Sequence, residues 1–384
     1  MSDGGSYDAI VVGLGAHGSA AALALARRGL RVLGLERFER GHGLGSSGGR
    51  TRIIRLAYFE DPSYVPLAVA SWDAWLALER ETGASILTPT GGLYAGLPGS
   101  AVLDGAIRSA REHHLPHEVL DTDEIRRRWP IFVPPDGAQA LIEEQAGVIH
   151  AAAAIEAQLA LAQRLGAELR CGRPASGWRP APGGGFEVET EGGKVIGGDH
   201  LVIAAGAWTS DVVPDLALPL SIERIPVLWF EPLVPVEEVG FGRLPVWILE
   251  TETDGSFYGF PYDPGVGLKV ARHHSEVFVS VDDVDRTLTA ADEARVRAFA
   301  KAHMPGADGA LMDSAICLYT NTPDQDFILD THPAGPGVAF ASACSGHGFK
   351  FAPVIGEALA DLALTGASEL PIEHFRASRL VAAP

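Results

Sequence analysis

Apolar positions at the beginning of the chain follow the period of a strand, then that of a helix, then that of a strand again. Residues 7–12 form an apolar run short enough for a buried strand, and the alanine-rich stretch that ends near Arg28 predicts a helix. A second apolar run over 30–35 predicts another buried strand, and Glu36 follows it. We therefore expect a βαβ unit, the building block of a parallel sheet.

The turn between the first strand and the helix contains Gly13, Gly15 and Gly18. Gly13 permits a tight turn, Gly15 lets backbone amides approach a pyrophosphate, and Gly18 lets the helix pack closely on the strand. Free N–H groups and the helix dipole at this helix N-terminus favour an anion. Glu36 is placed to accept hydrogen bonds from ribose hydroxyls. These features predict a site for an ADP-containing cofactor, with nicotinamide and flavin both open.

The rest of the chain alternates between two kinds of pattern. Helices are expected at 65–81, 151–169 and 354–364, a hairpin at 186–190 and 194–196, and buried strands at 200–208 and 337–343. Short strands and turns rich in aromatic residues fill the stretches between them. We predict an α/β protein with a Rossmann-like nucleotide-binding domain built from 1–84, 147–219 and 319–384, and a second domain with a mixed or antiparallel sheet built from 85–146 and 220–318.

Charge and composition narrow the possible partners. A net charge of −19, with no basic run longer than residues 126–128, argues against nucleic acid and anionic membranes as partners. No apolar run reaches the length that spans a bilayer. Cys171, Cys317 and Cys344 form neither a disulfide framework nor a zinc motif, so a reducing, cytoplasmic setting is expected. The histidines at 113, 114 and 117 lack metal-ligand spacing, and we assign no metal.

Several separated stretches match one group of flavoproteins. Besides the glycine turn, they are 51–55 with Tyr58, 64–67, 128–130, 258–261, 267–269, 317–320 and 345–351. In this order, over nearly the whole chain, they resemble the amino-acid and amine oxidase family, and most closely its sarcosine oxidase and N-methyltryptophan oxidase members. The resemblance implies an FAD-binding Rossmann-like domain, a substrate domain and a monomer. It also implies oxidation of a secondary amine, most simply an N-methyl amino acid, by hydride transfer to flavin N5, imine hydrolysis and reoxidation by O2 to H2O2.

The resemblance also assigns residues to the cofactor. Cys317 would carry FAD covalently through a flavin ring methyl, and a thiolate is a suitable nucleophile for that link. Lys269 would lie beside flavin N5 and promote the reaction of reduced flavin with oxygen, because a positive charge stabilises the anions that form. Arg52 would lie against the flavin, although Thr51 and Arg52 could instead brace the loop. Further cofactor contacts are implied for Thr51, Gly346, Gly348 and Lys350. Cys344 is expected to be a packing residue.

Substrate contacts follow from the same resemblance. Arg55 and Lys350 would bind the substrate carboxylate, which suits an arginine fork and a lysine point charge. Tyr258, His273 and Tyr319 would line the substrate cavity. Glu60 aligns with an acid at the cavity entrance, and a solvent-facing loop acid is an equally good interpretation.

One stretch departs from the family pattern and leaves the substrate open. Residues 46–50 read Ser-Ser-Gly-Gly-Arg where sarcosine and N-methyltryptophan oxidases carry paired histidines before the Thr-Arg signature. A fructosyl amino acid, a cyclic imino acid or a biosynthetic amine are therefore alternative substrates. A protein of another class, which binds a dinucleotide without catalysis, would not need the cysteine and the two lysines at matching places.

Overall fold

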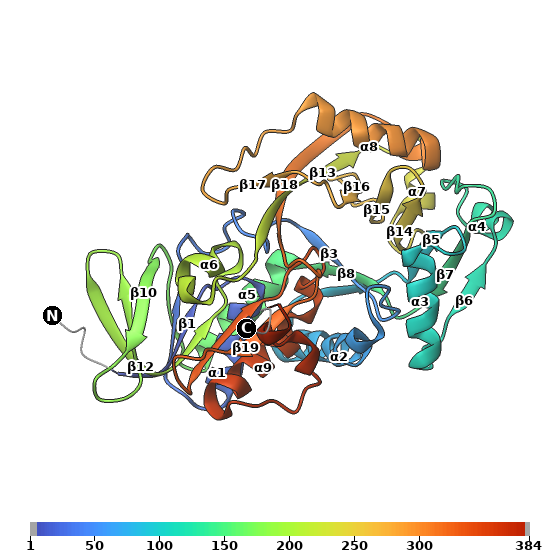
Figure 1. Ribbon diagram of the computed structural model, residues 1–384. Helices are drawn as coiled ribbons and strands as arrows, with labels where there is room; N and C mark the ends of the chain where they lie inside the picture. The colour runs from blue at the N-terminus through green and yellow to red at the C-terminus, as the bar shows by residue number, and fades with distance from the viewer. Residues whose placement is uncertain (1–5, 381–384) are drawn as a thin grey trace.

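A mainly parallel sheet, which we call the nucleotide sheet, forms one half of the molecule (Figure 1). The computed structural model describes residues 6–380. Within this range the nucleotide sheet has the order β10-β11-β12-β1-β2-β9, with β20 beside β12 and β19 beside β20. Its strands are β1 (Tyr7–Val12), β2 (Val32–Leu35), β9 (Glu168–Arg170), β10 (Ala175–Pro180), β11 (Phe186–Thr190), β12 (Lys194–Ile203), β19 (Ile328–Thr331) and β20 (Val338–Ser342).

Helices cover one face of the nucleotide sheet because small residues allow close packing. They are α1 (Ala16–Arg27), α2 (Val65–Thr82), α5 (Ala151–Arg164) and α9 (Ala352–Thr365). Side chains of β1 alternate between the two faces: Ala9 and Val11 pack in the core with these helices, whereas Ile10 packs in the core on the other face. Helices α1 and α9 approach so closely that a Cβ atom on Gly356 would lie 2.5 Å from the Ala20 backbone.

A second large sheet, which we call the substrate sheet, forms the other half. Its order is β17-β13-β16-β15-β14-β5-β7-β6, with β18 beside β13, and all described pairs are antiparallel except β14 with β5. Its strands are β5 (Gly92–Gly96), β6 (Glu118–Leu120), β7 (Gln139–Glu143), β13 (Ser221–Phe230), β14 (Val246–Thr251), β15 (Gly255–Gly259), β16 (Leu268–His273), β17 (Phe278–Val279) and β18 (Leu311–Asn321).

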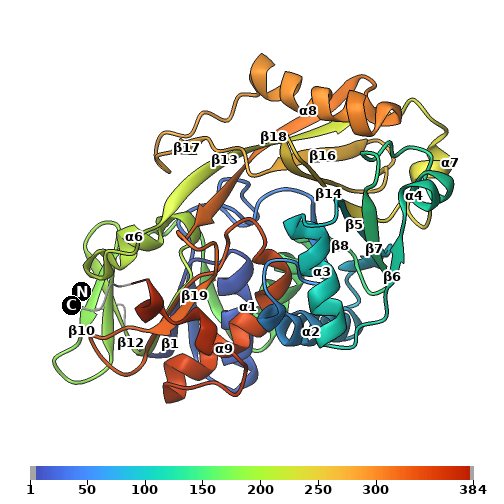
Figure 2. The same ribbon diagram turned by 45° about the vertical axis from the view of Figure 1, so that its right-hand side comes forward.

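Helix α8 (Ala290–His303) lies along the outer side of the substrate sheet (Figure 2). Its capping box joins Thr289 to Asp292, and Val296 and Phe299 enter the core of the sheet. The other helices near this half are α3 (Ala101–Glu112), α4 (Thr122–Arg128) and α7 (Val236–Val239), while α6 (Thr209–Val212) follows β12. Within residues 6–380, no helix combines the length and the apolar character needed to cross a bilayer.

A small third sheet lies between the two halves and orders β3 (Thr51–Ile54), β8 (Gly147–His150) and β4 (Leu87–Pro89). Short 3-10 helices complete the fold: η1 (Pro62–Tyr64), η2 (Gly206–Trp208), η3 (Pro214–Leu216), η4 (Pro305–Ala307), η5 (Phe349–Phe351), η6 (Glu373–Phe375) and η7 (Ala377–Arg379). Strand β3 and helix η5 bring two predicted site segments next to each other, although they are remote in sequence.

The α/β fold predicted from the sequence is confirmed, whereas single elements differ from the expectation. The helix expected over 151–169 ends at Arg164, because Gly166 adopts a left-handed conformation with φ of 100° and strand β9 begins two residues later. Strand β10, which contains Trp178 and Pro180, was not expected. The domain boundaries inferred from the pattern stay a prediction.

Candidate cofactor and substrate site

The carboxyl ends of four adjacent parallel strands, β2, β1, β12 and β20, meet at one edge of the nucleotide sheet. Ligands of open α/β sheets bind at this edge. A cavity of about 380 Å³ lies here, and its lining includes Gly13, Gly15, Glu36 and Ala205. We call it the nucleotide cavity.

The glycine turn has the geometry that the sequence predicted. Gly13 has a φ of 88°, and a Cβ atom there would lie 2.5 Å from the Ala204 carbonyl oxygen. A Cβ atom on Gly18 would lie 1.7 Å from the Gly13 carbonyl oxygen, so only glycine permits this contact between helix and turn. Gly15 is the residue before helix α1, and the Ala16 amide donates to Ser47 Oγ at 2.9 Å.

Glu36 closes the other side of the turn. Its carboxylate accepts hydrogen bonds from the amides of Leu14 at 2.8 Å and Phe38 at 3.0 Å, and His42 Nε2 lies 3.3 Å away. Burial alone would raise the pKa of Glu36, but these hydrogen bonds lower it below its ordinary value. Glu36 is therefore an ionised acceptor at the position where the sequence predicts the ribose.

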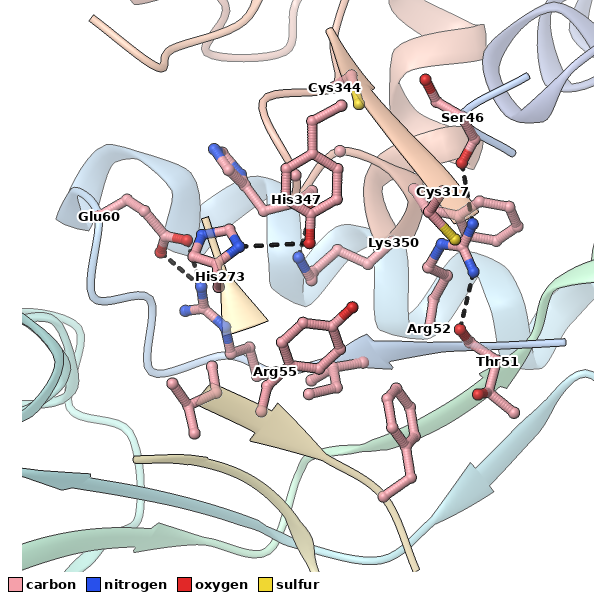
Figure 3. Close-up of a pocket in the computed structure, with 18 of the residues that line it drawn as sticks. Ser46, Thr51, Arg52, Arg55, Glu60, His273, Cys317, Cys344, His347 and Lys350 are labelled. Atoms are coloured by element: carbon pink, nitrogen blue, oxygen red, sulfur yellow. Dashed lines mark hydrogen bonds and ion pairs between the residues drawn. The ribbon is translucent and has the colours of Figure 1, made fainter. Parts of the chain in front are cut away.

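A second, smaller cavity of about 90 Å³ adjoins the first, with Ser46, Cys344 and Phe349 lining both. We call it the inner cavity. Figure 3 shows that strand β3 and the segments around residues 273, 317 and 346–350 surround it. Residues predicted for the site that line it are Thr51, Arg52, Arg55, Glu60, Tyr258, Lys269, His273, Cys317, Tyr319, Gly346, Gly348 and Lys350.

Lys269 is a buried cation held by neutral oxygens. Its ammonium donates to Thr51 O at 3.1 Å and Thr51 Oγ1 at 3.3 Å, and it lies 4.3 Å from the centre of the Phe260 ring. Burial, together with the charge of Arg52, lowers the pKa of Lys269 to about 7. Within the described part of the chain, no carboxylate forms an ion pair with it.

Arg52 braces the loop that precedes it. Its guanidinium donates to the carbonyl oxygens of Ser46 and Thr51, each at 2.9 Å, and to that of Gly48. It also lies over the Phe349 ring at 5.4 Å. The bracing that the sequence left as an alternative is thus present, and the same side chain lines the inner cavity.

Arg55 lies buried and forms an ion pair with Glu60 through one of its guanidinium nitrogens. One guanidinium nitrogen contacts the two carboxylate oxygens at 2.6 and 2.5 Å. Burial alone would raise the pKa of Glu60, but Arg55 lowers it to about 2 with help from His347 and Lys350. Glu60 is therefore part of the inner cavity and occupies the fork that the resemblance assigns to a substrate carboxylate.

Lys350 is a second buried cation held by neutral oxygens. Its ammonium donates to the His347 carbonyl oxygen at 2.5 Å and to Tyr58 Oη at 3.3 Å. Burial and the nearby Arg55 hold the pKa of Lys350 well below its ordinary value. Arg55 and Lys350, 295 positions apart in the sequence, therefore face the same cavity.

Aromatic side chains and two glycines shape the remaining wall. His273 Nδ1 lies 3.4 Å from Tyr319 Oη, and burial raises the pKa of Tyr258 to about 12. A Cβ atom on Gly346 would lie 2.6 Å from the Tyr319 ring, so a side chain at this position cannot be accommodated without movement. Gly348 directly precedes helix η5, which carries Lys350.

Two free cysteines line the inner cavity. Cys317 lies on β18, opposite Ile225 of β13, and Cys344 follows β20. Cys344 packs against the neighbouring core, as expected, and in addition it borders both cavities, which the sequence did not predict.

Comparisons with known proteins agree with this geometry. The sequence profile described as FAD dependent oxidoreductase matches residues 8–362. The chain belongs to this FAD-dependent oxidoreductase family. Monomeric sarcosine oxidase of Streptomyces avermitilis is 42% identical over 99% of each chain, and N-methyl-L-tryptophan oxidase of Yersinia pestis is 31% identical over 97% of this chain and 99% of the relative. NikD, an amino acid oxidase essential for nikkomycin biosynthesis, has a similar structure, with a TM-score of 0.84 at 25% identity over 97% of each chain.

The residues of this FAD-dependent oxidoreductase fit an extended, polar cofactor. Ser46 Oγ, Thr320 Oγ1 and Ser342 Oγ belong to residues lining the nucleotide cavity and, within residues 6–380, are buried without a hydrogen-bond partner. Buried hydroxyls of this kind require a partner, and the ribityl and phosphate oxygens of FAD are suitable ones. The cavity therefore offers a glycine turn, a ribose acceptor and free hydroxyls along one path.

Three features of the oxidoreductase site were not predicted. Tyr58 and His347 lie within the matched stretches, but the sequence assigned them no role. In the structure Tyr58 contacts both Lys350 and His347. Ser47 lies in the stretch that departs from the family pattern, and its hydroxyl accepts from the first amide of helix α1. No local cue points to any of the three contacts, because each joins segments that are remote in sequence.

Proposed function

We propose that this oxidoreductase oxidises a secondary amine that carries a carboxylate, most simply an N-methyl amino acid. The observation that supports it best is the charge of the inner cavity. Arg52, Arg55, Lys269 and Lys350 line it with Glu60 as the acid, in a chain whose net charge is −19. A concentration of buried cations in an acidic protein favours an anionic ligand.

The chain's own residues would bind and orient the substrate. Arg55 and Lys350 take the carboxylate, which holds the substrate amine and its C–H bonds in one orientation. His273, Tyr258 and Tyr319 form the wall around the amine. Arg55 becomes available when the substrate carboxylate replaces Glu60 in its fork. Lys269 supplies positive charge where oxygen is reduced.

FAD would lie across both cavities. The turn at Gly13 and Gly15 would let backbone N–H groups at the start of helix α1 donate to its pyrophosphate, Gly18 would keep the helix close to the turn, and Glu36 would accept from its ribose. When bound, FAD would supply the oxidising group for this chemistry, in which the carbon beside the amine nitrogen loses a hydride, water hydrolyses the imine that results, and O2 takes up the electrons as H2O2. Cys317 is the proposed attachment point, because it is a free thiol at the wall of the inner cavity.

The test is anaerobic bleaching of the flavin by a set of amines. We expect N-methylglycine to bleach it, followed by H2O2 formation when air is admitted. N-methyltryptophan, pipecolate and a fructosyl amino acid test the alternative substrates. The methyl ester of N-methylglycine is the matched control, because it keeps the amine but lacks the carboxylate, and we expect it to react at least about tenfold more slowly. Absence of bleaching with every amine would overturn the proposal.

We further propose a monomer in a reducing, cytoplasmic setting. The three free cysteines support the location, and the relatives named monomeric sarcosine oxidase support the oligomeric state. Size-exclusion chromatography with light scattering tests the monomer, and fractionation of cells tests the location.

A further inference from the structure

A buried hydrogen-bond chain behind Lys350 begins at the carbonyl oxygen of Gln325. His347 Nε2 lies 3.2 Å from this oxygen, and a carbonyl can only accept, so Nε2 carries a hydrogen. Burial lowers the pKa of His347 to about 3, and the ring is therefore neutral. A neutral ring with a hydrogen on Nε2 has an acceptor at Nδ1.

The direction of the next link follows from that tautomer. Tyr58 Oη lies 2.5 Å from His347 Nδ1, so the hydroxyl of Tyr58 must donate to the ring. Its oxygen then presents lone pairs to Lys350 Nζ at 3.3 Å. Tyr58 is fully buried and lies face to face with Tyr64, whose ring centre is 4.8 Å away. The Tyr58 hydroxyl therefore has one orientation available.

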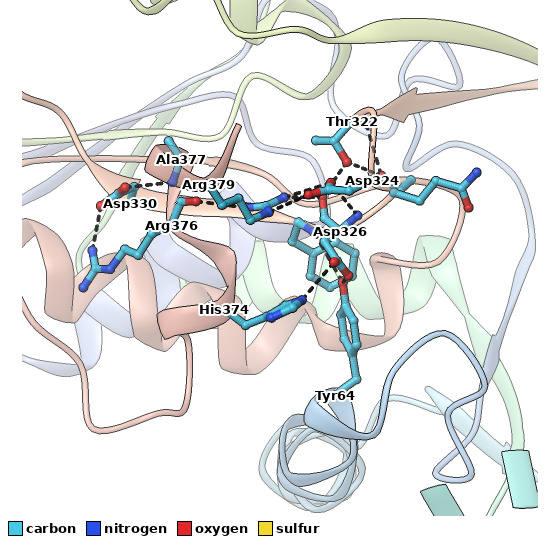
Figure 4. A network of polar contacts seen from close by, with 12 residues as sticks. Tyr64, Thr322, Asp324, Asp326, Asp330, His374, Arg376, Ala377 and Arg379 are labelled. Atoms are coloured by element: carbon cyan, nitrogen blue, oxygen red, sulfur yellow. Dashed lines mark hydrogen bonds and ion pairs between the residues drawn. The ribbon is translucent and has the colours of Figure 1, made fainter. Parts of the chain in front are cut away.

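The start of the chain is itself anchored. Asp326, the residue after Gln325, holds this loop to its surroundings, and Figure 4 shows its contacts with Tyr64 and His374. The Asp326 carboxylate accepts from Tyr64 Oη at 2.7 Å and contacts His374 Nε2 at 2.8 Å, while its carbonyl oxygen accepts from Thr322 Oγ1 at 2.7 Å. These contacts hold the loop that contains Gln325 and Asp326 against Tyr64, His374 and Thr322.

We propose that Tyr58 and His347 are positioning residues that hold Lys350 for the substrate carboxylate. Because the Gln325 carbonyl oxygen accepts a hydrogen bond but is too weak a base to take up a proton, the hydrogen-bond chain fixes geometry rather than conducting protons. Lys350 makes two hydrogen bonds, to Tyr58 Oη and to the His347 carbonyl, which leaves its third N–H available to the inner cavity that it lines. This inference rests on the proposed binding of a carboxylate substrate.

The experiment measures carboxylate binding separately from turnover. Acetate is titrated into the flavin-loaded protein, and the flavin absorbance change gives its Kd; steady-state kinetics with N-methylglycine give KM and kcat. Loss of a hydrogen bond to a charged group predicts that Tyr58→Phe raises the acetate Kd and KM by about tenfold or more. We expect a smaller change in kcat and little change in the reaction of the methyl ester.

Two histidine variants test the direction of the chain. His347→Leu should weaken acetate binding as Tyr58→Phe does, because Tyr58 loses its acceptor. His347→Gln should restore binding to within about threefold of wild type, since its amide can accept from Tyr58 and donate to Gln325. Tyr94→Phe is the matched control: Tyr94 is also buried, and its hydroxyl donates to Glu143 instead. A Kd within about twofold of wild type in both Tyr58→Phe and His347→Leu would overturn the proposal.

The outcomes separate this inference from the proposed function. A wild-type protein that neither binds acetate nor oxidises an amine contradicts both proposals. A wild-type protein that does both, beside Tyr58 and His347 variants that bind acetate equally well, contradicts only the positioning role. Flavin absorbance before titration and thermal unfolding exclude loss of fold as the cause of weak binding.

Discussion

Lys269→Met should separate the two halves of the catalytic cycle. The lowering of the Lys269 pKa from 10.5 to about 7 corresponds to about 5 kcal/mol against the charged side chain. An anion that forms about 4 Å from the Lys269 ammonium is attracted to it by about 4 kcal/mol at an effective dielectric constant near 20, which offsets most of that cost. Such an anion appears when oxygen accepts electrons, but not when the amine loses a hydride. We therefore expect Lys269→Met to slow reoxidation by about a thousandfold and reduction by less than about tenfold.

Stopped-flow absorbance measures the two half-reactions separately. Reduction is followed after anaerobic mixing with N-methylglycine, and reoxidation after mixing the reduced protein with oxygenated buffer. Lys301→Met is the matched control, because the side chain of Lys301 is 68% exposed. Equal losses in both half-reactions would refute the reasoning, since they would place the effect of Lys269 in folding or cofactor binding.

The same pKa gives a pH dependence with a defined sign. Lys269 carries its proton below about pH 7 and loses it as the pH rises through that value. Reoxidation of the wild-type protein should therefore slow with rising pH across this range. The variant Lys269→Met has no such proton and should lack this decline, which the same stopped-flow traces reveal.

Three further substitutions test the cofactor and the substrate site. Cys317→Ser should release all flavin on acid precipitation, whereas Cys344→Ser, in the same cavity, should keep a yellow pellet. Glu60→Gln should lower the unfolding free energy by about 3 kcal/mol, because Arg55 remains buried without its anion, and acetate should restore part of the loss in thermal unfolding. Gly18→Ala should lower both the flavin content and the melting temperature, because overpacking costs about 3 kcal/mol. Gly177→Ala is the control and should change neither, because a Cβ atom there meets no atom within 4 Å. Equal effects of the two variants would contradict the packing argument.

The sequence predicted the nucleotide half well because its signal is local. The glycine turn, helix α1 and Glu36 lie within one βαβ unit, so spacing alone places them at the same sheet edge. Helix α5 was predicted too long, since an alanine-rich pattern does not mark its own end and the left-handed Gly166 decides it. Local periodicity thus predicts which elements exist better than where they end.

The contacts of the inner cavity could not be predicted from spacing. Tyr58 and His347 are 289 residues apart, and Thr51 and Lys269 are 218 apart, so only the tertiary fold brings them together. The resemblance pointed to most of the residues that line the inner cavity, because a matching motif marks a position without revealing which side chains touch. The pairing of Arg55 with Glu60 was missed although the two are close in sequence, since an acid on a loop has many orientations available.

The partners of the buried cations indicate where anions act in this protein. Arg55 has the carboxylate of Glu60, whereas Lys269 and Lys350 donate hydrogen bonds only to carbonyl and hydroxyl oxygens within the described residues. Neutral oxygens orient an ammonium but do not neutralise it, which is why burial lowers both lysine pKa values. An anion beside either lysine stabilises the charged form of the side chain. This stabilisation raises the lysine pKa again and offsets the free-energy cost of burying the charge. On the proposed function, the two lysines are therefore suited to two anions: the substrate carboxylate at Lys350 and reduced oxygen at Lys269.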